Sequence, residues 1–328
     1  MKLLILGGTS FLGRHLAAEA IEAGHELTLF HRGKTNPGLF PRAEEILGDR
    51  ATDLALLDGR EFDAVFDTCG YLPKIVRRSV QAFGTRARLY VFVSSISVYP
   101  VEDWPGVTED SPTLRASDPE TDTFTMEAYG ELKAACDDLV LRELPGRALV
   151  IRPGLIVGPH DPSDRFTYWL RRIAEGGDVA APLPQSRRIG FVDARDLAAF
   201  MLACAEGSRT GLLNAVGPIG DACTMGEFLQ TCREVAGSDA RFNWLPAEFL
   251  AEHAVEPPSD MPLFIPGQDD AFDCSPAARA GFTTRPLIDT VRDTLRWDDT
   301  RPRIAPLRAG LTRARERDLL AAWGRRGG

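Results

Sequence analysis

The chain has 328 residues, of which 44% are hydrophobic and 26% are charged, and its formal net charge at pH 7 is −9. This composition is typical of a globular protein with about two domains, and the excess of acidic residues argues against a nucleic-acid backbone as the main partner. The six cysteines are widely spaced and include no C-x-x-C pair, so the sequence predicts no metal site and no disulfide framework, only the free thiols of a cytoplasmic protein.

A glycine-rich turn follows the first predicted strand. Residues 2–6 form a short apolar run that stops at glycines, which is typical of a strand buried on both faces and not of a signal peptide or a membrane span. The letters GGTSFLG occupy residues 7–13, residues 14–23 have helical periodicity, and residues 26–30 predict a second strand. In dinucleotide-binding proteins such a turn presents the free N–H groups of the helix N-terminus to a pyrophosphate. We therefore predict cofactor contacts from Gly7, Thr9, Ser10, Phe11, Leu12 and Gly13.

Basic residues follow the second predicted strand. NAD-binding domains usually place an acidic residue here, which accepts hydrogen bonds from the ribose hydroxyls. This chain has His31, Arg32 and Lys34 instead. Cations tolerate a 2′-phosphate that an acid would repel, so we predict that these three residues contact the cofactor and that NADP is preferred over NAD. The alternative is a solvated basic loop.

The next strands predict further walls of the same pocket. Strands are predicted over residues 44–47, 62–67 and 89–93, with a helix over 73–83 between the last two. The carboxyl ends of parallel strands meet at one edge of a sheet, where ligands of α/β proteins bind. Small residues after the fourth strand allow a cofactor to pass close to the backbone. The residues that we expect to contact the cofactor at these strand ends are Asp49, Arg50, Thr68, Cys69, Gly70, Val93 and Ser94.

A tyrosine and a lysine lie four residues apart at the start of the next predicted helix. Tyr129 and Lys133 would share one face of a helix that runs to about Leu144. An ammonium beside a phenol favours the phenolate, so the pair can exchange a proton with a carbonyl or an alcohol near neutral pH. Only four of the 38 basic residues are lysines. The alternative is an amphipathic helix with a surface lysine. Residues 100–125, rich in Pro and acidic residues, are interpreted as a lid beside the site.

The second half of the chain is less regular. After a sixth strand at 148–152, the patterns predict a helix near 165–175, a Pro-rich loop at 181–186, a strand at 188–192, a helix at 193–205, a strand at 211–216, a helix at 224–236, loops over 246–276 and a helix at 287–297. The tail from residue 301 is rich in arginine, and we predict a basic helix docked on the body of the protein.

Five sequence blocks together resemble the extended short-chain dehydrogenase/reductase family, the NAD-dependent epimerase/dehydratase group. The resemblance covers essentially residues 1–300. The blocks are GGTSFLG at 7–13, VSSISVYP at 93–100, YGELK at 129–133, RPGLIVGPHD at 152–161 and RIGFVDARDLA at 188–198. Their order and spacing make chance agreement very unlikely.

The resemblance implies roles for residues at the matching positions. Ser95 aligns with the hydroxyl residue that hydrogen-bonds the reacting oxygen, and Tyr129 with the general acid and base. Lys133 would favour the phenolate and hold the nicotinamide ribose. Pro153 and Gly154 would lie near the nicotinamide. The resemblance further implies a small-molecule substrate and a homodimer through helices of the first domain.

The chain departs from the family pattern at two places. Ser10 replaces the usual middle glycine, and this GGTxFLG variant also occurs in a branch that includes chloroplast RNA-associated proteins. Ile96 and Ser97 replace the acidic pair of the family's dehydratases, which disfavours sugar dehydration.

The sequence thus predicts an α/β protein with a Rossmann-type, doubly wound parallel sheet and a smaller C-terminal α/β domain. The dinucleotide domain is expected over residues 1–155 with a returning piece near 188–215, the substrate domain over about 156–187 and 216–300, and the docked helix over 301–328. The leading hypothesis is an NAD(P)-dependent carbonyl reductase or alcohol dehydrogenase acting on a small polar metabolite. The alternatives are a nucleotide-sugar epimerase with tightly bound NAD and a non-catalytic nucleotide- or RNA-associated module.

Overall fold

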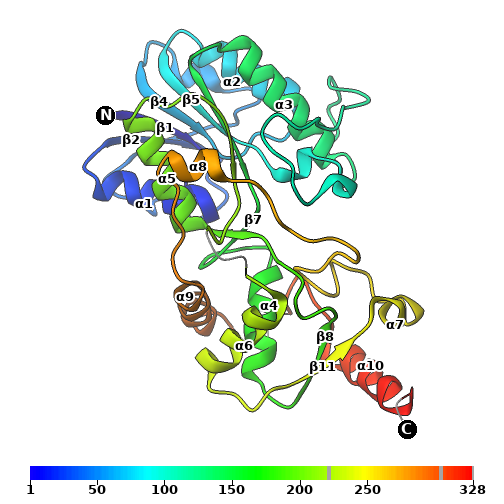
Figure 1. Cartoon of the computed structure of the whole chain (residues 1–328). Coiled ribbons are helices and arrows are strands. Elements are labelled where there is room, and N and C mark those ends of the chain that lie inside the picture. Colours follow the sequence, from blue (N-terminus) through cyan, green and yellow to red (C-terminus); the bar gives the residue numbers. More distant parts are fainter. Residues whose placement is uncertain (220–222, 303–305, 327–328) are drawn as a thin grey trace.

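The computed structural model describes residues 1–219, 223–302 and 306–326. Parts of the second domain expected over 216–300 and of the tail expected over 301–328 therefore lie outside the described residues. The described chain forms two lobes, one built around a large sheet and one mainly helical (Figure 1). None of the helices in these ranges is long and apolar enough to cross a membrane.

Seven parallel strands form the sheet of the first lobe, in the order β10-β6-β5-β4-β1-β2-β3. Chain order reverses between β1 and β4, which makes this the switch point of a doubly wound sheet. The strands are β1 Lys2–Leu6, β2 Glu26–His31, β3 Glu44–Leu47, β4 Phe62–Asp67, β5 Ala87–Val93, β6 Ala148–Pro153 and β10 Gly211–Ala215.

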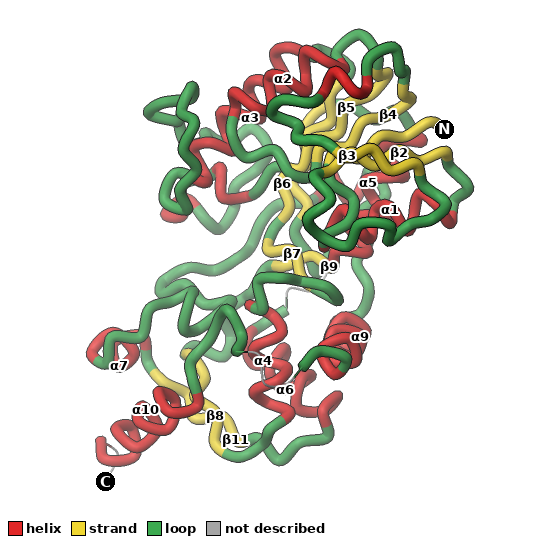
Figure 2. The backbone as a smooth tube through the Cα atoms, turned by 180° about the vertical axis from the view of Figure 1, so that it is seen from behind, coloured by secondary structure: helices red, strands yellow, loops and turns green. Residues whose placement is uncertain are grey.

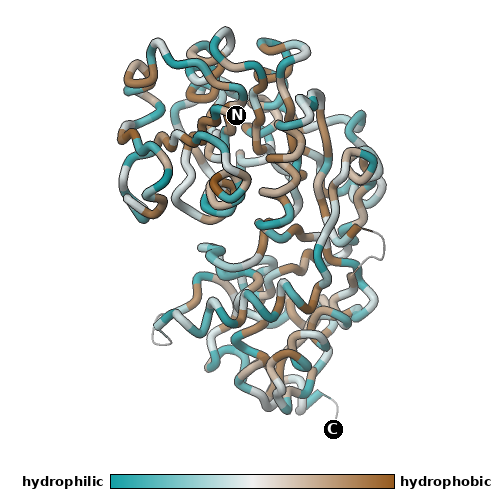
Figure 3. The backbone as a smooth tube through the Cα atoms, turned by 90° about the vertical axis from the view of Figure 1, so that its left-hand side faces the viewer, coloured by the Kyte–Doolittle hydropathy of each residue, from teal (hydrophilic) through white to brown (hydrophobic). Residues whose placement is uncertain are grey.

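Helices cover both faces of this sheet because its strands are apolar on both faces. Leu3 and Ile5 of β1 belong to the core beneath α1 (Phe11–Glu22) and α5 (Ala194–Glu206). Leu4 and Leu6 point the other way, into the core shared with α2 (Pro73–Phe83) and α3 (Tyr129–Glu143). The predicted Rossmann-type fold is confirmed, and Figure 3 shows the apolar (brown) stretches running through both lobes.

The second lobe has its own core, which the C-terminal helix completes. It contains α4 Arg165–Ala174, β8 Asp178–Pro182, α6 Met225–Ala236, β11 Arg241–Leu245, α7 Ala247–Glu252, α9 Leu287–Asp299 and α10 Arg313–Arg326 (Figure 2). A short parallel pair, β7 Leu155–Val157 and β9 Phe191–Asp193, lies between the lobes. Short 3-10 helices cover η1 Leu54–Leu57, η2 Ile96–Val98 and η3 Val101–Asp103.

Two features of this lobe differ from the sequence-based expectation. The pair β8 and β11 is absent from the prediction, which placed a loop at 181–186. The helix α10 fixes this pair to α4, because Glu316 of α10 accepts hydrogen bonds from Ala180 N of β8 (3.0 Å) and from Arg172 Nε of α4 (2.5 Å). The segment with α8 (Ser275–Arg279) packs on the first lobe, where the rings of Phe200 and Phe282 lie 5.0 Å apart.

Candidate active site

A pocket of about 540 Å³ opens at the carboxyl edge of the large sheet. Its walls come from the residues that follow β1, β2, β3, β4 and β5, together with the first turns of α1 and α3. Its size is that of a typical small-molecule site. Most residues expected to bind a cofactor line it. Those that do not are Gly70, Pro153 and Gly154, and the expected catalytic residue Ser95 does not line it either.

The glycine turn forms one wall, and its glycines are needed for close approach. A Cβ atom on Gly7 would lie 2.8 Å from Thr68 Oγ1, and one on Gly13 would lie 2.7 Å from Gly8 N. Ser10, which takes the place of the family's middle glycine, has φ −131° and ψ 140°. Any residue adopts this extended backbone, and the Ser10 side chain is exposed. The turn therefore keeps the form of a dinucleotide cradle with serine at this position, and a dinucleotide fits the residues present.

The basic loop after β2 contains two exposed cations and one histidine that is bonded to neighbouring residues. His31 Nδ1 accepts a hydrogen bond from Gly33 N (3.1 Å), and its Nε2 lies 2.8 Å from Glu45 Oε1. Arg32 and Lys34 are exposed, line the pocket and form no ion pair within the described ranges. Positive charge at this end of the pocket thus comes from Arg32 and Lys34.

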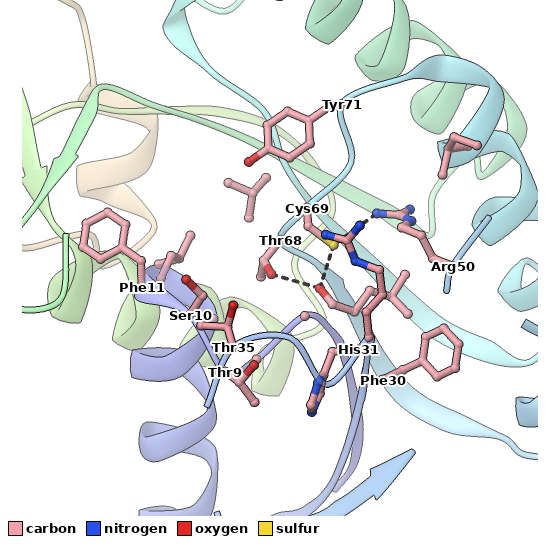
Figure 4. Close-up of a pocket in the computed structure, with 18 of the residues that line it drawn as sticks. Thr9, Ser10, Phe11, Phe30, His31, Thr35, Arg50, Thr68, Cys69 and Tyr71 are labelled. Carbon is pink, nitrogen blue, oxygen red and sulfur yellow. Dashed lines mark hydrogen bonds between the residues drawn. The ribbon is translucent and has the colours of Figure 1, made fainter. Parts of the chain in front are cut away.

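Arg50 lines the pocket, but its charge is paired with a buried carboxylate. Its guanidinium donates two hydrogen bonds of 2.5 Å to the Asp67 carboxylate at the end of β4, and one of 2.8 Å to Ser79 Oγ. The Tyr90 hydroxyl donates a third bond to Asp67, at 2.8 Å. In Figure 4 the Arg50 side chain lies beside Cys69, across the pocket from Phe11. Its main partner is therefore Asp67, and the side chain also forms part of the pocket wall, where a cofactor contact is expected.

Tyr129 and Lys133 both line the pocket from the first turns of α3. The buried Lys133 ammonium donates to Gly70 O (2.7 Å) and Val93 O (2.5 Å) and lies 4.2 Å from the centre of the Phe92 ring. Two of its three N–H groups are thus used to hold it between the ends of β4 and β5, which leaves one for a ligand. No hydrogen bond joins Lys133 to Tyr129 in the part of the chain described. Gly70 therefore contributes through its backbone oxygen.

Ser95 does not line the pocket, and its hydroxyl is bonded to Ser97. Its hydroxyl donates to Ser97 Oγ (3.0 Å) and accepts from Ser97 N (3.1 Å), and it caps η2. Ser94 lines the pocket instead. Pro153 ends β6, and a Cβ atom on Gly154 would lie 3.0 Å from Val216, so both belong to packing at the edge of the sheet.

Several apolar residues of the pocket were missed by sequence reasoning. The ring of Tyr71 lies 6.5 Å from the Tyr129 ring. The ring of Phe124, which does not line the pocket, lies 6.2 Å from the Tyr129 ring. Phe124 belongs to the loop interpreted as a lid, which is tied to α2 by Lys74–Asp122 (2.9 Å) and Arg77–Glu120 (2.6 Å) ion pairs. The sequence held a signal for some of the missed lining residues, because these residues lie at or directly after the ends of the predicted strands. The missed lining residues are Leu6, Gly8, Phe30, Thr35, Gly48, Tyr71, Leu72, Ile75, Ile156 and Pro162.

Gly130 sets how closely α3 approaches the loop that carries Ser95. A Cβ atom at this position would lie 2.1 Å from the Ser97 carbonyl oxygen, which is backbone and cannot move aside alone. We expect Gly130→Ala to push the start of α3 away and to lower kcat at least about tenfold, since small misplacements of catalytic groups cost large factors in rate. Steady-state kinetics measures this effect.

The matched control is Gly324→Ala on α10, where an added Cβ meets no atom within 4 Å. This substitution should leave kcat unchanged and raise stability slightly through helix propensity. Equal kcat values for Gly130→Ala and the parent protein would contradict the assigned packing.

Comparisons with known proteins agree with this geometry. A sequence model described as the NAD dependent epimerase/dehydratase family matches residues 73–216. The chain is 29% identical over 283 residues to a dTDP-6-deoxy-L-talose 4-dehydrogenase (NAD(P)(+)) of Kitasatospora kifunensis, covering 75% of this chain and 82% of that protein. It is 27% identical over 225 residues to the chloroplast stem-loop binding protein of 41 kDa b of Arabidopsis thaliana, covering 61% of this chain and 54% of that protein.

A solved structure shares the fold. The UDP-glucuronic acid 4-epimerase of Bacillus cereus, in complex with NAD, superposes with a TM-score of 0.68 and 17% identity, covering 92% of this chain and 99% of that one. At this identity the likeness shows the architecture alone.

Proposed function

We propose that the chain is an NAD(P)-dependent oxidoreductase of the NAD dependent epimerase/dehydratase family and that it interconverts a hydroxyl and a carbonyl group on a small polar metabolite. The family model that matches residues 73–216 and the similarity to the talose dehydrogenase support this proposal. The observation that carries this proposal is that one pocket joins the glycine cradle to Tyr129 and Lys133. A cofactor site and a proton-transfer pair in one cavity are what a hydride-transfer enzyme needs.

The proposed roles follow from the positions of the side chains. A bound nicotinamide would supply or accept the hydride. The Tyr129 hydroxyl gives its proton to the carbonyl oxygen in reduction and takes it back in oxidation. The Lys133 ammonium, fixed by Gly70 O and Val93 O, stabilises the phenolate and offers its remaining N–H to the cofactor ribose. Ser95 would bond the reacting oxygen after exchanging its bond to Ser97.

The glycine turn and the basic loop would hold the dinucleotide. The backbone N–H groups at the start of α1 face the pyrophosphate, and the loop after β2 is pinned to the turn because Asn36 Nδ2 donates to Thr9 O at 3.0 Å. Arg32 and Lys34 remain available for a 2′-phosphate. NADP is therefore the cofactor that we favour over NAD.

Removal of these two charges should change cofactor choice. We expect the double variant Arg32→Ala/Lys34→Ala to weaken NADPH binding by about tenfold to a hundredfold and NADH binding by less than about threefold, because only NADPH carries the extra phosphate. Calorimetric titration measures both dissociation constants. Arg88→Ala is the control, since Arg88 lies at the start of β5 with its side chain 85% exposed. Equal losses for the two cofactors would refute the preference.

The alternatives predict different behaviour of the purified protein. An epimerase would carry tightly bound NAD through purification and consume no added cofactor. An RNA-associated module, the alternative suggested by the stem-loop binding relative, would bind a structured RNA and turn over no dinucleotide. The negative net charge and the Tyr129–Lys133 pair in the pocket favour the oxidoreductase.

Turnover with added cofactor tests the proposal. We would incubate the protein with NADPH and a panel of small ketones and nucleotide-linked keto-sugars, and follow oxidation of the nicotinamide. Stoichiometric consumption of NADPH with formation of an alcohol supports the oxidoreductase. Conversion of a nucleotide-linked sugar to its epimer without cofactor consumption would replace it with the epimerase.

A further inference from the structure

A second, smaller hollow adjoins the cofactor pocket on its outer side. It has a volume of about 260 Å³ and is lined by residues at the start of α1 and by residues in and after α9. The helices α1 and α9 face each other across the two lobes in Figure 2. The hollow and the pocket share Ser10, Phe11, Thr35 and Pro162. The two cavities are therefore neighbours that share part of their wall at the glycine turn.

Three arginines from distant parts of the chain line this hollow. Arg14 comes from α1, and Arg301 and Arg308 come from the C-terminal segment. Arg301 is fixed, because it donates to Asp164 Oδ1 (2.6 Å) and its guanidinium lies 4.8 Å from the centre of the Trp297 ring. Within the described ranges, the guanidinium groups of Arg14 and Arg308 make neither an ion pair nor a hydrogen bond. Two cations without an ion-pair partner in these ranges thus face one cavity, which the Asp161 carboxylate also lines.

The other groups around the hollow do not cancel this charge. Burial, together with the nearby Arg14 charge, lowers the pKa of His160 to about 4, so the ring is neutral at pH 7. The buried Asp161 carboxylate is turned to Ser163, from which it accepts hydrogen bonds of 2.8 Å and 2.9 Å. Asp164 is neutralised by Arg301 and also accepts from Arg308 N at 3.1 Å. Asp164 therefore fixes the backbone at Arg308.

We propose that this hollow binds a phosphate group of the dinucleotide cofactor, with Arg14 and Arg308 as its direct ligands. Guanidinium groups match phosphate oxygens in geometry as well as charge. The shared residues Ser10 and Phe11 lie at the start of α1, where the pyrophosphate is expected, and this shared wall favours the cofactor over a free anion. The inference rests on the proposed cofactor site. It makes the C-terminal segment part of that site, so that a bound cofactor bridges the two lobes.

The test is calorimetric titration of NADPH into the full chain and its Arg14→Gln and Arg308→Gln variants. Each variant should raise the dissociation constant about tenfold, as expected for loss of a hydrogen bond to a charged group, and should bind with a weaker dependence on salt concentration. Arg296→Gln is the control, because this residue is on α9 with its side chain 74% exposed. Unchanged melting temperatures exclude unfolding as the cause.

Three outcomes would overturn the inference. If the parent protein binds NADPH and both variants bind equally well, the hollow does not hold the cofactor. If inorganic phosphate binds the parent protein, is lost in Arg308→Gln and fails to compete with NADPH, the hollow is a site for a free anion. If the parent protein binds no dinucleotide at all, the proposed function fails first, and the inference fails with it.

Discussion

Tyr129→Phe should lower kcat by about a hundredfold to ten-thousandfold, the range expected when a general acid and base is removed, while the dissociation constant for NADPH stays within about twofold. The substitution removes one hydroxyl and keeps the ring. The ring contacts with Tyr71 and Phe124 are therefore retained. Because the Lys133 ammonium is held by Gly70 O and Val93 O and not by Tyr129, its position does not depend on the phenol.

The comparison needs kcat and cofactor affinity from the same preparation. Tyr168→Phe is the matched control, since Tyr168 lies in the core of the second lobe, outside the pocket. It should leave kcat unchanged. A kcat for Tyr129→Phe within a few-fold of the parent value would exclude the acid and base role.

Asp67→Asn should destabilise the protein by about 3–5 kcal/mol, because it leaves the buried Arg50 guanidinium without a charged partner. Asp67 is fully buried and accepts from both arms of Arg50 and from the Tyr90 hydroxyl. The Glu44–Arg60 pair is the control, since both of its side chains are more than one third exposed. Glu44→Gln should cost less than about 1 kcal/mol. Urea unfolding measures both free energies.

The Arg50–Asp67 pair also gives the stability a dependence on pH. Burial alone would raise the pKa of the Asp67 carboxyl, but the Arg50 charge and hydrogen bonds outweigh it and hold the pKa below its ordinary value. A carboxylate of this kind stabilises the fold above its unfolded pKa, near ~3.9, and the contribution is lost as pH falls through its lower folded pKa. The loss on acidification should be smaller in Asp67→Asn. A cost under about 1 kcal/mol for Asp67→Asn at neutral pH would contradict the assigned burial.

The sheet and its ligand edge could be predicted from the sequence because their signals are local. Apolar runs such as 2–6 and 62–67 show strands buried on both faces, and the GGTSFLG turn shows where the first strand meets its helix. The carboxyl ends of parallel strands then fall together by topology. This reasoning placed Tyr129 and Lys133 on one helix and near the glycine turn, as the structure has them.

What the sequence did not show is which charged residues find partners inside the protein. Arg50 follows a strand end, as a cofactor ligand would, but its partner Asp67 is 17 residues away on another strand. His31 is bound to Glu45, 14 residues later. These pairings depend on strand register and burial, which no local pattern encodes. The β8–β11 pair was missed for a similar reason, since its strands are about 60 residues apart and contain small residues and Pro182.

The most direct test of the account is calorimetric titration of NADPH, NADP, NADH and NAD into freshly purified protein that has been checked for bound nucleotide. The account predicts that the dinucleotides bind with one-to-one stoichiometry and that the phosphorylated forms bind more tightly, because Arg32 and Lys34 stand free at the end of the pocket. A protein that carries no nucleotide and binds none of the four dinucleotides would contradict the account. The glycine turn would then have the shape of a dinucleotide site without binding a dinucleotide.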